Sequence, residues 1–150
     1  MKWFSLSALV VLLDQATKLL ADARLAYHDP VPLLPFFNLR LAYNTGAAFS
    51  FLGNAGGWQR WFFASISIIV IGVLVVWMRR LKPEQWPLSL AFALIIGGAF
   101  GNLIDRLVYG HVIDFIDVYY GTWHWPTFNI ADSAITGGAV LLLLDAWLAH

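Results

Sequence analysis

Two uncharged apolar segments set the strongest limit on what this chain can fold into. Residues 61–78 and 86–104 contain no Asp, Glu, Lys or Arg over 18 and 19 residues, close to the ~20 residues that a helix needs to cross the hydrocarbon of a bilayer. Because no water reaches the backbone there, such a segment must satisfy its own hydrogen bonds and is expected to be helical. The two segments therefore predict an integral membrane protein.

Two further apolar segments have the length of a membrane span but carry charges. The first, about residues 3–21, contains Asp14 and Lys18, and the last, about residues 130–149, opens with Asp132. An ionised side chain near the bilayer centre costs ~2.5–3.5 kcal/mol on insertion scales, so such a charge needs a partner or a function. The chain is 60% apolar and only 12% charged, too little charge to cover a soluble surface. We therefore expect a mainly α-helical membrane protein with a bundle of four transmembrane helices.

The first segment also has the features of a cleaved signal peptide. Lys2 would be its basic start, residues 3–13 its apolar core, and "ADA" at 21–23 its cleavage site. However, Asp14 and Lys18 lie between the core and that site, where a signal peptide is normally uncharged. We therefore favour a retained helix.

Basic residues cluster at one end of the expected bundle. Lys2 precedes the first span, and Arg79, Arg80 and Lys82 crowd the short link between the second and third. The positive-inside rule places both groups in the cytoplasm, so both termini are expected to be cytoplasmic. The expected architecture is one domain, residues 1–150, with spans at about 3–21, 61–78, 86–104 and 130–149 and outer loops at about 22–60 and 105–129.

The two outer loops carry strand patterns. The stretch "FFNLRLAYNTGAAFSFL" alternates up to a turn at Asn44–Gly46 and resumes with Phe49 and Phe51, which predicts short strands in a small extracytoplasmic β-sheet. The stretch "VYGHVIDFIDVYYGTWHWPT" is rich in aromatic and β-branched residues and fits either a strand or an interfacial helix.

The topology brings polar residues from separate segments to one depth. At ~1.5 Å of rise per residue, Asp14 and Lys18 lie in the outer half of the first span, where the third span ends and the fourth begins. The converging residues are Asp14, Lys18, Asn102, Asp105, Arg106, Asp114, Asn129 and Asp132. Scattered solvation does not predict such convergence, so we expect a site at the outer membrane boundary.

Each of these residues also has a purely structural interpretation. Asp14 and Lys18 are spaced i,i+4 with the acid first, a favourable helical ion pair. Asn102 suits a hydrogen bond between helices, and Asp105–Arg106 suits a solvated helix end.

The same holds for the last span and the loop before it. Asn129 is a typical N-cap, and Asp132 in the first turn complements the helix dipole. Asp114 and Asp117 in "VIDFIDVY" fit ordinary loop carboxylates.

Small residues in the last two spans predict close helix contact. Gly97 and Gly101 form a GxxxG motif, and Ser133 with Gly137 forms a small-xxx-small motif. Such motifs let helix backbones approach, so we expect the third and fourth spans to pack tightly.

The residue types favour carboxylate chemistry. The chain has no cysteine, which excludes disulfides and thiolates. It has no GxSxG motif or glycine-rich phosphate loop, and its four histidines lack metal-ligand spacing. Its net charge of zero gives no reason to expect nucleic acid as a partner. We therefore expect no metal and no cofactor.

Two aspartates that face one water at a partly desolvated site cannot both ionise cheaply. One stays protonated, so the pair can activate water and protonate a leaving amine. Asp132 with Asp114 is the best-placed pair, with Asp14, Asp105 and Asp117 as competitors. Lys18 and Arg106 would support the site or, alternatively, hold an anion.

Two other functions fit the same carboxylates. An ion or proton carrier needs ionisable groups across the membrane, whereas the second and third spans are uncharged inside and only Asp145 lies deep in the inner half. A structural adaptor would use the polar residues only to hold helices together.

Five motifs, in this order, resemble the lipoprotein signal peptidase family (signal peptidase II), bacterial inner-membrane aspartyl peptidases. They are "DQATK" in the first span, "YNTGAAFSFL" after it, "GGAFGNLIDR" ending the third span, "GHVIDFIDVY", and "FNIADSAI" opening the fourth. Each motif is weak alone, but all five in order on four spans are specific, and they cover almost the whole chain.

The resemblance implies a reaction and a set of roles. Such enzymes cut the signal peptide from diacylglyceryl-modified prolipoproteins just before the lipidated cysteine, need no metal, and are typically inhibited by globomycin-type cyclic peptides. The catalytic pair would be Asp114 and Asp132, with Asp117 a bystander and Asp105 structural. The supporting and substrate-binding positions would be Asp14, Lys18, Asn44, Asn102, Arg106 and Asn129.

The resemblance also implies partners and a location. We expect prolipoprotein substrate and membrane lipid as partners, and a monomeric enzyme in the bacterial inner membrane. The site would lie near the periplasmic face, with the small sheet and the loop around Asp114 clamping the peptide above it.

Overall fold

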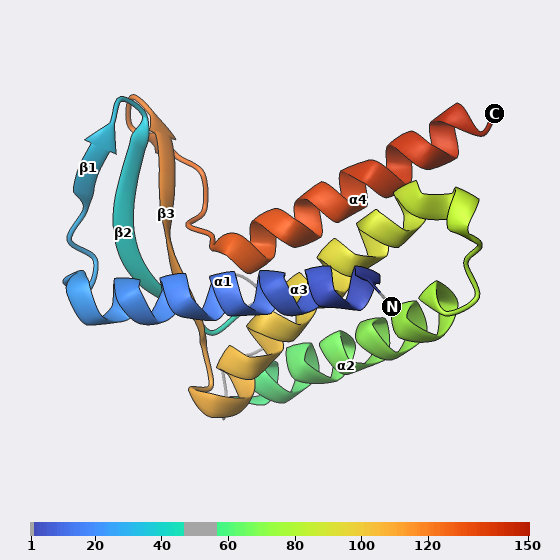
Figure 1. The fold of residues 1–150 in the computed structure, drawn as a ribbon. Coiled ribbons are helices and arrows are strands. Elements are labelled where there is room, and N and C mark those ends of the chain that lie inside the picture. The colour runs from blue at the N-terminus through green and yellow to red at the C-terminus, as the bar shows by residue number, and fades with distance from the viewer. Residues whose placement is uncertain (1, 47–56) are drawn as a thin grey trace.

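The computed structural model describes residues 2–46 and 57–150, and this part of the chain forms four long helices and one small sheet (Figure 1). The helices are α1 (Lys2–Arg24), α2 (Trp58–Met78), α3 (Trp86–Val108) and α4 (Ile130–Leu148). All four are long and apolar enough to cross a membrane. The predicted fold class, a four-helix membrane protein with a small sheet, is therefore confirmed.

The sheet is antiparallel and joins the two outer loops. Its strand order is β1 (Val31–Leu34), β2 (Phe37–Asn44), β3 (Val112–Tyr120) and β4 (Trp123–His124). The strand interpretation of the second loop is right, and the interfacial-helix alternative is wrong. Phe49 and Phe51, predicted to continue the strands, lie outside the described residues.

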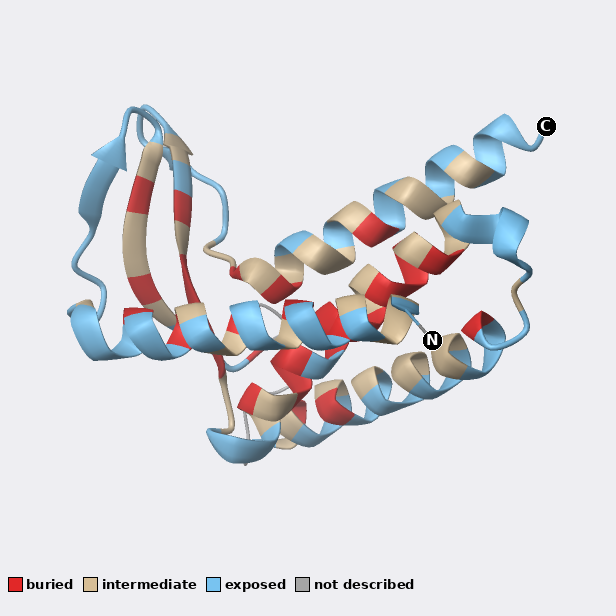
Figure 2. Cartoon of the chain, in the orientation of Figure 1, coloured by how far each residue is buried: buried red, intermediate tan, exposed pale blue. Residues whose placement is uncertain are grey.

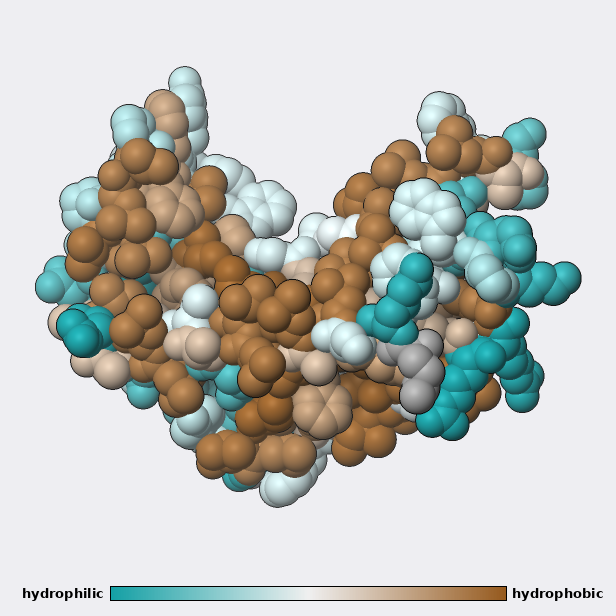
Figure 3. All heavy atoms as spheres, viewed as in Figure 1, coloured by the Kyte–Doolittle hydropathy of each residue, from teal (hydrophilic) through white to brown (hydrophobic). Residues whose placement is uncertain are grey.

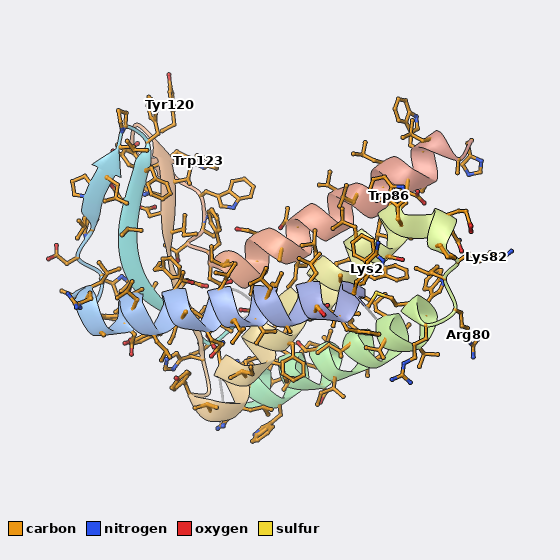
Figure 4. All side chains as sticks on the ribbon, viewed as in Figure 1. Lys2, Arg80, Lys82, Trp86, Tyr120 and Trp123 are labelled. Atoms are coloured by element: carbon orange, nitrogen blue, oxygen red, sulfur yellow. The ribbon has the colours of Figure 1, made fainter. Side chains whose placement is uncertain are left out.

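The sheet lies at the end of the bundle where α1 and α3 end and α4 begins (Figure 1). Strand β2 pairs with β3 so that Ala42 lies opposite Asp114 and Asn44 opposite Val112. The basic end of the molecule is the other one, where Lys2, Arg80 and Lys82 project near the 3-10 turn η2 (Pro83–Gln85) (Figure 4). The strand pairing therefore carries Asp114 to the end of the bundle where Asp132 begins α4.

Helix α3 is the central helix of the bundle. It contacts α1, α2 and α4, and buried residues run along its whole length, whereas the other helices bury far fewer of their residues (Figure 2). Near its start, Phe92 and Ile96 form a buried cluster with Met78 of α2. Every other helix is therefore packed onto α3.

The outward faces of the helices carry large apolar side chains (Figure 3). Ile69 of α2 is 65% exposed and Leu143 of α4 is 72% exposed. In water, such surface costs ~25 cal/mol per Å², but lipid chains are as apolar as these side chains. The surface is therefore suited to hydrocarbon.

Glycines do bring α3 and α4 together, but they are not the ones that the motifs indicate. A Cβ added at Gly98 would collide with Ala131 and Ile135 of α4, and one added at Gly138 would lie 2.7 Å from the carbonyl oxygen of Ala91 in α3. Gly137, the residue in the sequence motif, has no atom within 4 Å of such a Cβ.

The GxxxG glycines face mainly α1, although a Cβ at Gly101 would also lie 3.4 Å from the Cβ of Ala131 in α4. A Cβ at Gly97 would lie 2.7 Å from Val10 of α1, and one at Gly101 would collide with the Asp14 carboxylate. Neighbouring helical positions differ by about 100° around the axis, so the spacing of small residues does not reveal which helix each one faces.

Adjacent glycines in α4 provide a matched test of this packing. Gly138→Ala should lower the thermal unfolding temperature in detergent, because overpacking costs roughly 1–3 kcal/mol. Gly137→Ala should keep this temperature or raise it slightly, since its Cβ meets nothing and alanine favours a helix over glycine by roughly 0.5–1 kcal/mol. Equal melting temperatures for the two variants would contradict the packing described here.

Candidate active site

A buried lysine lies at the centre of the polar residues at the sheet end. Lys18 Nζ is 2.7 Å from Asp14 Oδ2 and 3.0 Å from Asp105 Oδ2, and it donates a 3.0 Å hydrogen bond to Asn102 Oδ1. Lys18 is only 1% exposed, and both aspartates are 0% exposed. The predicted Asp14–Lys18 ion pair is confirmed, whereas the interpretation of Asp105 as a solvated helix end is wrong.

The two carboxylates bound to Lys18 also accept hydrogen bonds from backbone amides of other elements. Asp14 Oδ1 accepts a 2.9 Å hydrogen bond from the Ala131 amide in α4. Asp105 Oδ2 accepts one of 2.9 Å from the Ile113 amide in β3. The lysine and its two acids therefore tie α1, α3, α4 and the sheet to one point.

Gln15 belongs to this cluster, although the sequence analysis gave it no role. Its Nε2 donates to Asp105 Oδ1 at 2.9 Å and to the Gly101 carbonyl at 3.1 Å. The signal available was its place in "DQATK", next to Asp14.

Two asparagines connect the central cluster to Asp114 and Asp132. Asn102 Nδ2 donates to Asp132 Oδ1 at 2.8 Å, and Asn129 Nδ2 donates to Asp114 Oδ1 at 2.8 Å. Asn129 also donates to Asn102 Oδ1 at 3.2 Å, so the two amides touch each other. The predicted role of Asn102 as a hydrogen-bonding residue between helices is confirmed.

Asn129 also caps the start of α4. Its Oδ1 accepts a 2.8 Å hydrogen bond from the Asp132 amide, and Asp132 Oδ2 accepts one of 3.3 Å from the Asn129 amide. This reciprocal pair is a capping box. The predicted N-cap is confirmed, and the same side chain also holds Asp114.

Asp114 occupies an environment that opposes its charge. Strand β3 buries it to 2% exposure. This burial, and then the nearby charge of Asp132, raises the pKa of Asp114 to about 7, against the opposing effects of Lys18, Asn129 and Asn44. The environment of Asp114 therefore favours the protonated form far more than that of an exposed carboxyl does. The interpretation of Asp114 as an ordinary loop carboxylate is wrong.

Asp132 differs from Asp114 in its access to the surface. It is partly exposed and lines a cleft of about 630 Å³ between the loop before α4 and the first turns of that helix. The lining residues are Trp125, Pro126, Thr127, Phe128, Asp132, Ser133, Ile135 and Thr136. Figure 3 shows the molecule hollowed between the sheet and α4.

Arg106 lies at the edge of the cluster. Its guanidinium is half-buried, and its charge acts on Asp132, Asp114 and Asp105. The guanidinium also lies over the Phe63 ring, 5.1 Å from its centroid. Arg106 therefore supplies positive charge from the α2 side of the site.

Asp117 is separate from this group, although it was a competitor for the catalytic pair. It is buried in β3 and bound to Asn38 and His124. The loop-carboxylate interpretation is wrong here as well, because β3 turns the side chain inward.

The arrangement places two carboxyl groups in different environments at one end of the bundle. A buried carboxyl near its pKa is linked through two amides to a carboxylate at the wall of a cleft, and such a pair can move protons to and from a water and a leaving group. Among residues 2–46 and 57–150, no three His, Asp, Glu or Cys side chains are grouped as metal ligands would be.

Comparison with known proteins gives a consistent result. Residues 6–148 match the family model described as signal peptidase II. The chain is 55% identical over 145 residues to a lipoprotein signal peptidase of Acinetobacter baumannii, covering 97% of this chain and 82% of that protein. It is 52% identical over 143 residues to the one of Cupriavidus taiwanensis, covering 95% and 81%.

A solved structure shares the fold. It is a bacterial membrane enzyme studied by the in meso method, with a TM-score of 0.87 and 33% identity, and the match covers 97% of this chain and 92% of that one.

The raised pKa of Asp114 predicts a stability cost that depends on pH. Its folded-state pKa of about 7 exceeds the ordinary 3.8, so the stability gained by proton binding is complete below pH ~4 and is lost as the pH rises through ~7. Asp114→Asn keeps the shape and removes the charge. Its melting temperature should therefore rise relative to wild type between pH 5 and pH 8.

The comparison needs a control for general pH effects. The exposed Asp29, changed to Asn, should give the same difference from wild type at both pH values. A constant difference for Asp114→Asn as well would contradict the raised pKa.

Proposed function

The chain belongs to the signal peptidase II family, a family of proteases that cleave signal peptides from prolipoproteins, and from this premise we propose that it is an aspartyl endopeptidase in which Asp114 and Asp132 activate water. We further propose that it cuts diacylglyceryl-modified prolipoproteins just before the lipidated cysteine.

One observation carries the proposal. Asp114 and Asp132 come from different elements, and the amides of Asn129 and Asn102 connect them, at 2.8 Å each. Burial raises the pKa of Asp114 to about 7, while Asp132 opens on the cleft. An acid and a base set apart by their environments are what hydrolysis of an amide requires.

The reaction follows from this division of roles. The Asp132 carboxylate takes a proton from a water molecule as the oxygen of that water attacks the carbonyl carbon of the scissile bond. Asp114 donates its proton to the carbonyl oxygen, which gives a neutral gem-diol. When the C–N bond breaks, Asp132 returns a proton to the leaving amine and Asp114 recovers one from a diol hydroxyl, so both acids regain their starting states.

The remaining residues support the pair without entering the proton transfers. Lys18, neutralised by Asp14 and Asp105, holds Asn102 in position. Asn44 lends Asp114 a further hydrogen bond. Arg106 supplies a positive charge that acts on both Asp114 and Asp132, and this charge offsets the negative charge of the pair.

The fold suits a lipid-anchored substrate. The protein is an integral inner-membrane protein, and we propose that both termini are cytoplasmic because Lys2, Arg79, Arg80 and Lys82 lie at the end opposite the sheet. The site would then be at the periplasmic face. There the substrate's acyl chains can stay in the bilayer while its backbone enters the cleft beside α4.

An ion or proton carrier is less well supported. The carboxylates of the cluster lie at one end of the bundle, and the central helix α3 contains no charged residue before Asp105. Asp145, half-buried near the other end of α4, has no described ionisable partner in α3 to continue a path.

We propose a monomer that needs no metal, cofactor or nucleic acid and is sensitive to globomycin-type cyclic peptides.

The catalytic pair is tested by charge removal at each position. Asp114→Asn and Asp132→Asn should each lower kcat by roughly 10²–10⁴-fold, the contribution that a general acid or base typically makes. Cleavage of a purified prolipoprotein in detergent micelles measures this. Asp145→Asn, on the same helix, is the matched control and should cut normally.

Folding must be followed in the same samples. Both variants should melt cooperatively and elute as wild type does. A variant that cuts at the wild-type rate excludes its residue from the pair, and loss of folding in both would favour the adaptor interpretation.

Substrate recognition is tested separately. A diacylglyceryl-modified prolipoprotein should be cut at least tenfold more efficiently than the same chain without lipid, because the acyl chains concentrate the substrate in the micelle, at ~0.8 kcal/mol per buried CH₂. Product mass reports the cut position. Equal cutting of both forms would contradict the proposed substrate class.

A further inference from the structure

Besides Asp114, the sheet buries a second carboxylate, which lies outside the cluster around Lys18. Asp117 in β3 is 0% exposed. Its Oδ2 accepts a 3.1 Å hydrogen bond from Asn38 Nδ2 in β2, and its Oδ1 lies 2.8 Å from His124 Nδ1. The side chain therefore bridges three strands, and the proposed reaction leaves it without a role.

Burial makes the partner of Asp117 important. A buried carboxylate is costly unless it is hydrogen-bonded, and within the described residues Asp117 has Asn38 and His124 as side-chain hydrogen-bond partners. Since a carboxylate oxygen accepts, His124 Nδ1 carries the hydrogen in this contact. The imidazole also stacks on Tyr119, with centroids 5.3 Å apart, so the ring is held from two sides.

His124 directly precedes residues 125–128, the segment that forms one side of the cleft and is called the cleft wall below. The chain turns back along β3, with Trp123 opposite Tyr120 and His124 opposite Tyr119. Trp123 and Tyr120 mark the outer end of this hairpin (Figure 4). The next four residues, 125–128, form one side of the cleft on which Asp132 opens.

Few other contacts hold the start of this wall. Strand β4 has two residues, Trp125 is 55% exposed, and Pro126 has no amide hydrogen to donate. At the start of the wall, the Trp125 amide donates to the Val118 carbonyl at 2.8 Å. At its far end Phe128 is paired with β3: its amide donates to the Ile116 carbonyl at 3.1 Å, and its carbonyl accepts from the Phe115 and Ile116 amides at 3.0 and 2.9 Å. The Asp117–His124 contact is the side-chain bond that anchors the start of the wall.

We propose that His124 is a positioning residue for the peptidase reaction, which acts with Asp117 to hold residues 125–128 where the substrate backbone binds. This inference rests on the proposed function. His124 acts through the cleft wall and not on the reacting atoms, so its loss should weaken substrate binding and leave the chemical step in place.

The test separates KM from kcat in the full-length enzyme, with a diacylglyceryl-modified prolipoprotein in detergent micelles. His124→Ala should raise KM roughly tenfold, the loss expected of one charge-assisted hydrogen bond, and should keep kcat within about twofold. His124→Asn should restore KM, because its Nδ2 takes the place of the imidazole Nδ1. His124→Gln keeps more bulk but misplaces the amide, so it should behave like alanine.

A double variant tests whether the two residues act as one unit. Asp117→Asn/His124→Ala should raise KM no further than His124→Ala alone, because the second change removes a bond already lost. Additive effects would overturn the pairing. His28→Asn is the matched control: His28 is also bonded within the sheet, to Arg40, but away from the cleft wall, and asparagine tolerates its positive φ.

Hydrogen exchange gives a readout that does not depend on activity. The Trp125 amide should exchange faster in His124→Ala and His124→Gln than in wild type, His124→Asn or His28→Asn. Wild-type KM and exchange in His124→Gln would overturn the inference while leaving the proposed function intact, and so would an equal KM rise in His28→Asn. If wild type fails to cut the lipid-modified substrate, the proposed function fails, but the exchange data still decide whether the wall is anchored by His124.

Discussion

The structure depends on one buried ammonium group. Lys18 is held between Asp14 and Asp105, and each acid also accepts a backbone amide, from α4 and β3 respectively. Removing one member of such a group typically costs 3–5 kcal/mol, because the remaining charges lose their compensation. The ion pairs of Lys18 therefore determine the geometry of this end of the bundle, and with it the positions of Asp114 and Asp132.

Close helix packing makes this arrangement possible. Gly101 leaves room for the Asp14 carboxylate against α3, and Gly98 and Gly138 let α4 approach the same helix. The polar ends of α1, α3 and α4 are thus brought within hydrogen-bonding distance, in a chain whose remaining helix surface is apolar. The pairing of β2 with β3 then brings Asp114 of the sheet to the same end of the bundle.

Much of this was predictable from the sequence, and the failures have physical causes. The length of an uncharged apolar segment predicts a membrane-spanning helix. The i,i+4 spacing and the capping pattern are local in sequence, so the Asp14–Lys18 pair and the Asn129 cap are predictable as well. Whether a carboxylate at a helix end meets water or a lysine on another helix depends on tertiary packing, and this is why the sequence does not predict the buried ion pair of Asp105 or the contacts of Gln15. Glycine spacing likewise does not reveal which neighbour a helix face meets, so Gly98 and Gly138 were missed.

In the proposed mechanism, the double use of Asn129 couples local opening of α4 to the loss of the catalytic pair. One side chain both caps α4 and holds Asp114, while the capped residue is Asp132 itself. If the first turn of α4 frays, the cap, the Asp114 contact and the orientation of Asp132 are lost in one event. Helix ends open more easily than whole domains, so heating should inactivate this enzyme before the bundle melts, and the operating temperature is then set by a single turn of helix.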